Sequence, residues 1–289
     1  MTIYERRQAD VGNIIALEHV NLAVPDQQLA TAFYIAGLGF TRDPYMFTGL
    51  ENMWVNIGRS QCHLPSRGTQ CLRGTIGIVV PDLQKLQRRL EKVAPLLAAT
   101  CFGFNANANA ERVEVTCPWG NRFRCHSPSP KFGTMELGMP YVEFDVPQGS
   151  AAGIAAFYRQ FIGAPATLDA EGGIAVANVC AGPEQRFYFR ETAAPLPDYD
   201  NHHIQIYIAD FSGPHAALLA RGLVTEETNA HQYRFRDIID PADGRVLYTV
   251  EHEVRSLANP LYARPLINRN PDQSNNDYIR GHDSFRGSC

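Results

Sequence analysis

The sequence lacks the long apolar runs that mark a secretory leader or a membrane-spanning helix. Its opening residues, MTIYERRQADVGN, carry charges of both signs and contain no apolar core of the kind found in signal peptides. Nowhere else do about eighteen apolar residues follow one another, which is the length that a membrane helix requires. We therefore expect a protein of the cytoplasm that does not cross a membrane.

An excess of basic charge and paired cysteine motifs are missing as well. The formal net charge of -4 argues against a nucleic-acid duplex as the main partner, because duplex binding needs a broad basic surface. The 7 cysteines form no CxxC pair, so we expect reduced thiols. A hydrophobic share of 45% can supply a substantial core, and a small-molecule substrate becomes the expected partner. A homodimer is also possible on these grounds.

What the sequence does contain is a repeat. Four segments alternate apolar residues as strands do and end in a turn residue, namely HVNLAVPD from His19, TIGIVVPD from Thr75, YVEFDVPQ from Tyr141 and HIQIYIAD from His203. Apolar residues at helical spacing follow each segment and predict helices over residues 27–37, 82–97, 150–162 and 213–221. Stretches rich in turn residues and β-forming residues come next. The repeating unit is therefore a strand, a helix and then further strands.

The predicted fold class is α+β, with four βαβββ modules. We place them at residues 14–66, 70–130, 136–193 and 200–256, as an N-terminal pair over 14–130 and a C-terminal pair over 136–256. AFY recurs at Ala32–Tyr34 and Ala156–Tyr158, which indicates that a two-module ancestor duplicated. An unrelated α+β protein with strands that merely look alike is the alternative.

The tail over residues 257–289 has neither a helical nor a strand period. Its apolar residues are spaced apart, at Tyr262, Leu266, Ile267 and Tyr278. We expect an extended arm that packs on the body or on a partner subunit, with free disorder as the alternative.

HVNLAVPD followed by AFYIAGLGF resembles the opening of modules in the vicinal oxygen chelate superfamily, and CPWGNRF and DPADGRV resemble its turn before the last strand. That superfamily holds glyoxalase I, extradiol dioxygenases, epimerases and antibiotic-resistance proteins. The resemblance implies curved mixed sheets around a cavity, with helices outside. It also implies a divalent metal on the concave face of each two-module sheet, held by the first and last strands.

Ligand positions follow from the resemblance. The leading residues of the first strands are His19, Thr75, Tyr141 and His203, and the central residues of the last strands are His63, Arg124, Tyr188 and Glu251. If neighbouring modules pair, each cavity receives two ligands. If the first module pairs with the fourth, as in fused glyoxalases, one cavity receives His19, His63, His203 and Glu251. We favour the second arrangement, and its ligand set fits iron, zinc, nickel, cobalt or manganese.

The identity of the carboxylate ligand stays open. The superfamily pattern places its glutamate at Tyr248, so we expect catalytic roles for Tyr248 and Glu251, with Glu253 or Glu143 as other possible ligands. Residues two apart in a strand share a face, and this rule places the candidate substrate-binding residues Asn21, Gln205, Tyr207, Tyr141 and Glu143 on the cavity side of the first strands. Arg124, from a last strand, is a further candidate as a clamp for an anion or carboxylate, with an ordinary internal ion pair as the alternative.

Three functions are compatible with these residues. The first is a metal-dependent enzyme with glyoxalase-like or epimerase-like chemistry, a lyase or an isomerase, acting on a small oxygenated substrate. The second is an iron-dependent extradiol-type dioxygenase, which cleaves aromatic rings. Tyr141 stands where the extradiol pattern has its first histidine, which counts against the standard form. The third is a metal-free small-molecule binding or resistance protein.

Overall fold

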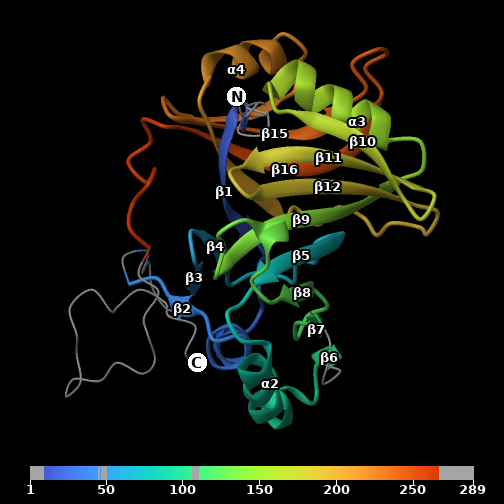
Figure 1. Cartoon of the computed structure of the whole chain (residues 1–289). Coiled ribbons are helices and arrows are strands. Elements are labelled where there is room, and N and C mark those ends of the chain that lie inside the picture. Colours follow the sequence, from blue (N-terminus) through green and yellow to red (C-terminus); the bar gives the residue numbers. More distant parts are fainter. Residues whose placement is uncertain (1–9, 45, 47–50, 106–110, 267–289) are drawn as a thin grey trace, which may run out of the picture.

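The computed structural model describes residues 10–44, 46, 51–105 and 111–266, and contains the four predicted modules (Figure 1). The first two modules consist of β1 (Ile14–Asn21), α1 (Gln27–Ala30) with a π-helical extension (Thr31–Gly37), β2 (Thr41–Arg42), β3 (Asn52–Ile57) and β4 (Ser60–Pro65), then β5 (Gly74–Val79), α2 (Leu83–Leu97), β6 (Gly103–Asn105), β7 (Arg112–Thr116) and β8 (Arg122–His126).

A short 3-10 helix (Pro130–Phe132) leads into the second half. The remaining modules consist of β9 (Gly138–Pro147), α3 (Ala151–Phe157) with a π-helical extension (Tyr158–Ile162), β10 (Ala166–Glu171), β11 (Ile174–Gly182) and β12 (Gln185–Thr192), then β13 (His203–Ile208), α4 (Ser212–Leu219), β14 (Val224–Asn229), β15 (Gln232–Ile239) and β16 (Val246–Ser256). The α+β fold of four βαβββ modules is confirmed.

Local sequence explains where the first two helices begin. Asp26 caps α1 by accepting from the backbone N–H groups of Gln28 and Leu29, and Asp82 caps α2 by accepting from that of Lys85. Along α2 the buried positions Leu86, Leu90, Val93 and Leu97 recur at helical spacing.

The strands form two open sheets that each combine modules from both halves of the chain. Sheet A has the order β14-β15-β16-β13-β1-β4-β3-β2 and sheet B the order β10-β11-β12-β9-β5-β8-β7-β6. In sheet A, β1 lies antiparallel to β13, with Asn21 opposite His203. The prediction that the first module pairs with the fourth, and the second with the third, is therefore confirmed. The boundaries of the two tandem halves stay a prediction.

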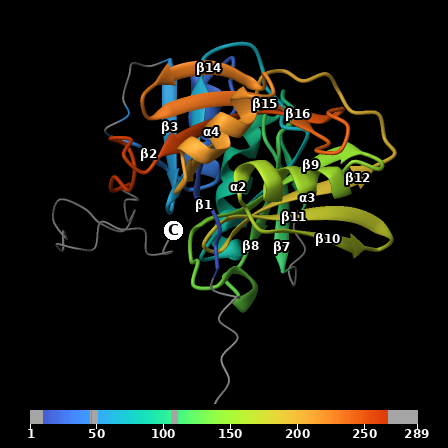
Figure 2. The same ribbon diagram turned by 90° about the horizontal axis from the view of Figure 1, so that it is seen from above.

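The helices lie on the side of the sheets away from the concave faces. Val20, Ile76, Val142 and Ile204, the second residues of the four repeats, are fully buried in one apolar core. Tyr158, from the second AFY motif, lies between the sheets, because its hydroxyl is 2.6 Å from His252 Nε2 of β16 and its ring lies 5.4 Å from that of Phe189 in β12. Figure 2 shows α2, α3 and α4 in this central layer.

Two expectations concern compartment and membrane. Cys62, Cys71, Cys101, Cys117, Cys125 and Cys180 are free thiols, and Cys289 lies outside the described residues. Among the residues that the structure describes, no helix is both long enough and apolar enough to cross a membrane. The cytoplasmic location stays a prediction.

Candidate metal centre

Strand register gathers three histidines on the concave face of sheet A. Asn21 of β1 lies opposite His203 of β13 on one side and opposite His63 of β4 on the other. His19 lies two residues before Asn21 on the same face of β1. The three imidazoles therefore surround Asn21 although they come from three strands.

The distances suit ligands of one ion. One nitrogen from each of His19, His63 and His203 lies within 4.8 Å of the other two. The His19 ring centroid is 5.7 Å from that of His203 and 5.8 Å from that of His63. Within the described part of the chain, these residues form the one such group of three or more histidine, cysteine or acidic side chains. The predicted approach of His19 to His203 is confirmed.

Burial keeps the three imidazoles neutral. It lowers the pKa of His19 and of His203 well below the usual 6.5, and nearby positive charge lowers both further. Burial, followed by the charge of His19, lowers the pKa of His63 to about 2. Neutral imidazole is the form that coordinates a metal, so the site needs no proton release from histidine at neutral pH.

Some buried polar atoms of the site lack a hydrogen-bond partner among the described residues. They are His19 Nε2, His203 Nε2 and both amide atoms of Gln205. An unsatisfied buried polar atom costs about 1–3 kcal/mol, so native structures leave few of them without reason. A metal ion would accept the histidine lone pairs, and the donor set therefore fits a divalent cation.

His63 is fixed by its neighbours. Its ring stacks on Trp54 with centroids 3.9 Å apart and an interplanar angle of 12°. Its Nε2 lies 2.5 Å from Asn52 Oδ1. Because an amide oxygen accepts, Nε2 donates and Nδ1 keeps the lone pair that could reach a metal.

The register corrects the choice of last-strand residue in the fourth module. His63, Arg124 and Tyr188 each lie opposite the third residue of their repeat, at Asn21, Gly77 and Glu143. The matching residue of β16 is Glu253, opposite Gln205, whereas Glu251 lies opposite His203. The sequence criterion took the centre of each terminal strand, and it misleads in β16 because that strand has 11 residues.

Both glutamates nevertheless lie beside His203. Glu251 Oε1 is 3.6 Å from His203 Nδ1, and Glu253 Oε2 is 3.6 Å from His203 Nε2. Arg234 bridges the two carboxylates, at 2.5 Å from Glu251 and also in contact with Glu253. Arg234 would therefore compete with an ion for the two carboxylate oxygens that lie beside His203.

Tyr248 lies away from the histidines. Its ring packs 5.9 Å from Phe144 and 6.2 Å from Phe189, both in sheet B, and 4.4 Å from the Arg73 guanidinium carbon. Tyr248 belongs to the core between the sheets because residue 248 points to the opposite face of β16 from Glu251. The structure does not bring this predicted catalytic residue into the site.

The candidate substrate-binding residues divide between the two sheets. Asn21, Gln205 and Tyr207 lie in strands of sheet A next to His19, with Gln205 directly opposite it. The other three candidates, Arg124, Tyr141 and Glu143, lie together on sheet B, where Arg124 Nη1 is 3.5 Å from the Tyr141 hydroxyl and 3.7 Å from Glu143 Oε1.

Solved structures share this architecture. A glyoxalase I mutant from Zea mays is 14% identical with a TM-score of 0.58, and the match covers 83% of this chain and 92% of that one. A Bacillus subtilis protein provisionally described as a dioxygenase is 14% identical with a TM-score of 0.56, over 84% of this chain and 86% of that one. The chain has the vicinal oxygen chelate fold. Its sequence matches no protein-family model and no curated protein sequence.

Charged residues that sequence reasoning missed surround the three histidines. Glu18 contacts His19, Arg255 contacts Glu18 and Glu253, and Arg234 bridges the two glutamates of β16. Alternating charges in VEHEVRS gave a signal for Arg255, since it shares a strand face with both glutamates. Glu18 gave no such signal, because in a regular strand it would face away from His19.

The segment after β16 runs toward β2 (Figure 1). Tyr262 lies edge-on to Tyr207 with ring centroids 4.9 Å apart. Arg264 pairs with Asp43 at 2.9 Å and donates to Gln61 Oε1 at 3.1 Å. Residues 257–266 therefore pack on the body, while Ile267 and Tyr278 of the expected arm lie outside the described residues.

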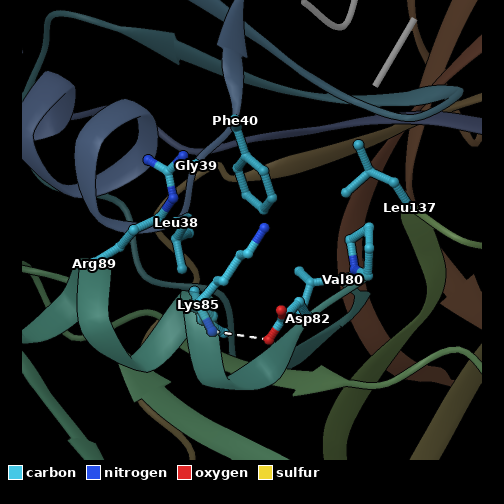
Figure 3. Close-up of a pocket in the computed structure, with 10 residues that line it drawn as sticks. Leu38, Gly39, Phe40, Val80, Asp82, Lys85, Arg89 and Leu137 are labelled. Atoms are coloured by element: carbon cyan, nitrogen blue, oxygen red, sulfur yellow. Dashed lines mark hydrogen bonds between the residues drawn. The ribbon is translucent and has the colours of Figure 1, made fainter. Parts of the chain in front are cut away.

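A surface pocket lies elsewhere, between the start of α2 and the loop before β2 (Figure 3). Phe40, Lys85, Arg89 and Leu137 are among its lining residues, and the dashed line marks the Asp82 cap of α2. None of the three histidines lines it. In this vicinal oxygen chelate fold the histidine group, rather than that pocket, offers metal ligands.

Proposed function

We propose that sheet A binds a divalent metal through His19, His63 and His203 together with a carboxylate from Glu253 or Glu251. The protein would then be a metal-dependent enzyme that acts on a small oxygenated substrate, with the lyase or isomerase chemistry of glyoxalases and epimerases. This ligand set suits iron, zinc, nickel, cobalt or manganese.

One observation carries the proposal. Three imidazoles converge with nitrogens within 4.8 Å, those of His19 and His203 buried and that of His63 half-buried, and His19 Nε2 and His203 Nε2 have no hydrogen-bond partner among the described residues. Imidazoles that served only packing would pair these nitrogens with other groups, because leaving them bare is costly. The likeness to glyoxalase I supports the fold only, because one fold can host many reactions. The proposed chemistry therefore rests on the residues of this site.

The charge around the histidines supports a cation. Three carboxylates, Glu18, Glu251 and Glu253, face two guanidinium groups, Arg234 and Arg255, and the Arg264–Asp43 pair adds no net charge. With neutral histidines the cluster has an excess of negative charge when its acids are ionised. A divalent cation would offset that excess in a buried setting where the electrostatic interaction is strong.

The other residues suit substrate handling. The Gln205 amide has no hydrogen-bond partner among the described residues and could orient a substrate oxygen, and Asn21 and Tyr207 lie near it in the same sheet. Burial raises the pKa of the Glu253 carboxyl, and the charges of Arg255 and Arg234 oppose that rise, so Glu253 could hold or release a proton. A bound ion would supply Lewis-acid polarisation of the substrate oxygens.

Two other functions each have one observation in their favour. An iron-dependent dioxygenase is favoured by the likeness to the Bacillus subtilis protein that is provisionally described as a dioxygenase. A metal-free binding or resistance protein is favoured by Arg234, which forms ion pairs with both glutamates of β16.

The cytoplasmic location, the small-molecule partner and a homodimer are further parts of the proposal.

Metal analysis separates the three functions. The protein would be purified without chelator, analysed by mass spectrometry for bound elements, and then dialysed against each metal and analysed again. We expect about one zinc, nickel, cobalt or manganese ion per chain, the stoichiometry of one three-histidine site. Iron alone would favour the dioxygenase, and no uptake of any of these metals would favour the binding protein.

A further inference from the structure

A β-bulge precedes His19 in β1. Leu17 lies opposite Ile206 and His19 opposite Gln205, so two steps along β1 match one step along β13. The extra residue is Glu18. A bulge turns its extra residue out of the regular alternation, which allows Glu18 and His19 to approach each other.

The Glu18 carboxylate is buried among polar side chains. Its Oε2 lies 3.4 Å from His19 Nδ1 and 3.1 Å from Arg255 Nη1, and its Oε1 lies 3.3 Å from the Tyr207 hydroxyl. Glu18 is 7% exposed and His19 is 1% exposed. The carboxylate therefore meets His19 in a site from which water is largely excluded.

The chemistry of these groups determines the direction of the contact. A guanidinium only donates, so Glu18 Oε2 accepts from Arg255. As an ionised carboxylate, Glu18 only accepts, so it also accepts from His19, which requires the proton of the neutral imidazole to be on Nδ1. The lone pair is then on Nε2, the His19 nitrogen that has no partner among the described residues.

We propose that Glu18 is the positioning residue of His19: it accepts from Nδ1, fixes the tautomer and keeps the Nε2 lone pair directed at the histidine group. The role rests on the proposed metal site. Hydrogen-bond acceptors on the outer nitrogen of a histidine ligand are a general means of orienting it.

Sheet B shows that the bulge itself belongs to the fold and that the carboxylate is specific to sheet A. In β9 the register with β5 shifts between Gly138 and Tyr141, immediately before the residue that corresponds to His19. Pro140 precedes Tyr141 there and offers neither a carboxylate nor a side-chain donor. The bulge thus occurs in both sheets, but only in sheet A does it place a carboxylate, that of Glu18, where it can accept a hydrogen bond from an imidazole.

The test uses Glu18→Ala, which removes the acceptor, and Glu18→Gln, which keeps a carbonyl oxygen facing Arg255. The His19 tautomer would be read from the nitrogen chemical shifts of ¹⁵N-histidine-labelled, metal-free protein, with His19→Gln assigning the signal. We expect Nδ1–H in wild type and Glu18→Gln, and a change toward Nε2–H in Glu18→Ala. Cobalt(II) affinity should fall roughly 10–100-fold in Glu18→Ala and less in Glu18→Gln.

The fold should survive because Arg255 keeps a second partner in Glu253, at 2.6 Å. Asp145→Ala is the matched control, since it removes an ion-paired carboxylate from a strand of sheet B, where Asp145 pairs with Arg122 at 2.5 Å. It should leave the His19 signal and cobalt affinity unchanged. Glu18→Met, which fills the volume without an acceptor, replaces Glu18→Ala if thermal unfolding shows that the latter does not fold.

An unchanged tautomer together with unchanged cobalt affinity in the variant without an acceptor would overturn the role of Glu18. The two proposals fail separately. Wild-type protein that takes up neither cobalt nor iron, zinc, nickel or manganese refutes the metal site, and the tautomer comparison in metal-free protein still decides whether Glu18 positions His19.

Discussion

The two sheets have the same order of modules and strands, but different side chains at matching positions. In sheet A, Arg234 of β15 lies opposite Glu253 of β16. In sheet B, Glu114 of β7 lies opposite Arg124 of β8, and the polarity of the pair is reversed. Where sheet A has the two leading histidines, sheet B has Tyr141 and Thr75.

Sheet B satisfies its own polar groups. His126 Nε2 lies 2.8 Å from the Tyr141 hydroxyl, and Arg124 pairs with Glu114 at 2.9 Å. The Tyr141 ring also fills the space above Gly77, where an added Cβ would lie 2.4 Å from ring atoms. Sheet A instead leaves His19 Nε2, His203 Nε2 and the Gln205 amide without partners among the described residues. One sheet thus pairs its polar groups with its own side chains, whereas the other leaves unpaired, among the described residues, the ring nitrogens that the proposed metal site would use.

The strongest test of this difference replaces the leading residue of corresponding modules. His203→Ala should reduce metal affinity by more than about 100-fold, beyond the range typical of residues outside the ligand shell. Thr75→Ala, at the same place in sheet B, should leave metal affinity unchanged. Equilibrium dialysis with elemental analysis measures both. Equal metal content in His203→Ala and wild type would contradict the metal site.

The pH dependence of stability should differ between the sheets. Burial lowers the pKa of His63 to about 2 and that of His126 to about 4, both from 6.5. Below pH 6.5 the unfolded chain binds protons that the folded chain does not, so stability falls as pH falls, by up to about 1.4 kcal/mol per pH unit for each histidine.

Urea unfolding of metal-free variants at several pH values checks this expectation. His63→Gln should flatten the dependence from pH 6.5 downward to the lowest pH at which the protein folds. His126→Gln should flatten it only between pH 6.5 and about 4, where that imidazole becomes protonated in the folded state. A slope that neither substitution changes would show that these imidazoles are not held neutral.

The register of β16 yields a smaller effect. Glu253→Gln should lower cobalt(II) affinity about tenfold, more than Glu251→Gln, because Glu253 occupies the position that matches His63 and lies on the Nε2 side of His203. Both variants loosen Arg234 from one carboxylate, so each controls for the other. Calorimetric titration would reveal the ligand, and a larger loss in Glu251→Gln would restore the sequence-based assignment.

The smallest effect concerns the segment that covers sheet A. Arg264→Met should lower the free energy of unfolding by about 1 kcal/mol, because the buried Asp43 loses a charged donor and keeps its bond from Gln61. Arg245→Met, in an ion pair with Asp243 whose side chains are 65% and 60% exposed, should change it by less than about 0.5 kcal/mol. Chemical denaturation measures both, and equal losses would show that residues 257–266 are not anchored there.

The sequence by itself determined the modules and the faces of the first strands. Strand alternation is local, so it predicted that His19 and His203 share a face with Asn21 and Gln205 and that Val20 and Ile204 are buried. Helical spacing likewise predicted the position of α2. The centre of β4 coincides with the register position of His63 because β4 is short, with 6 residues in all.

Only the tertiary structure decided which glutamate of β16 occupies the register position that matches His63, and how Glu18 takes part. Register between β13 and β16 is a long-range property, and it placed Glu253 where the sequence pattern had placed Glu251. The bulge that turns Glu18 toward His19 arises from pairing with β13, so no local period could reveal it. Tyr248 packs in the core against Phe144 and Phe189 of sheet B, and the sequence of β16 alone does not predict these contacts.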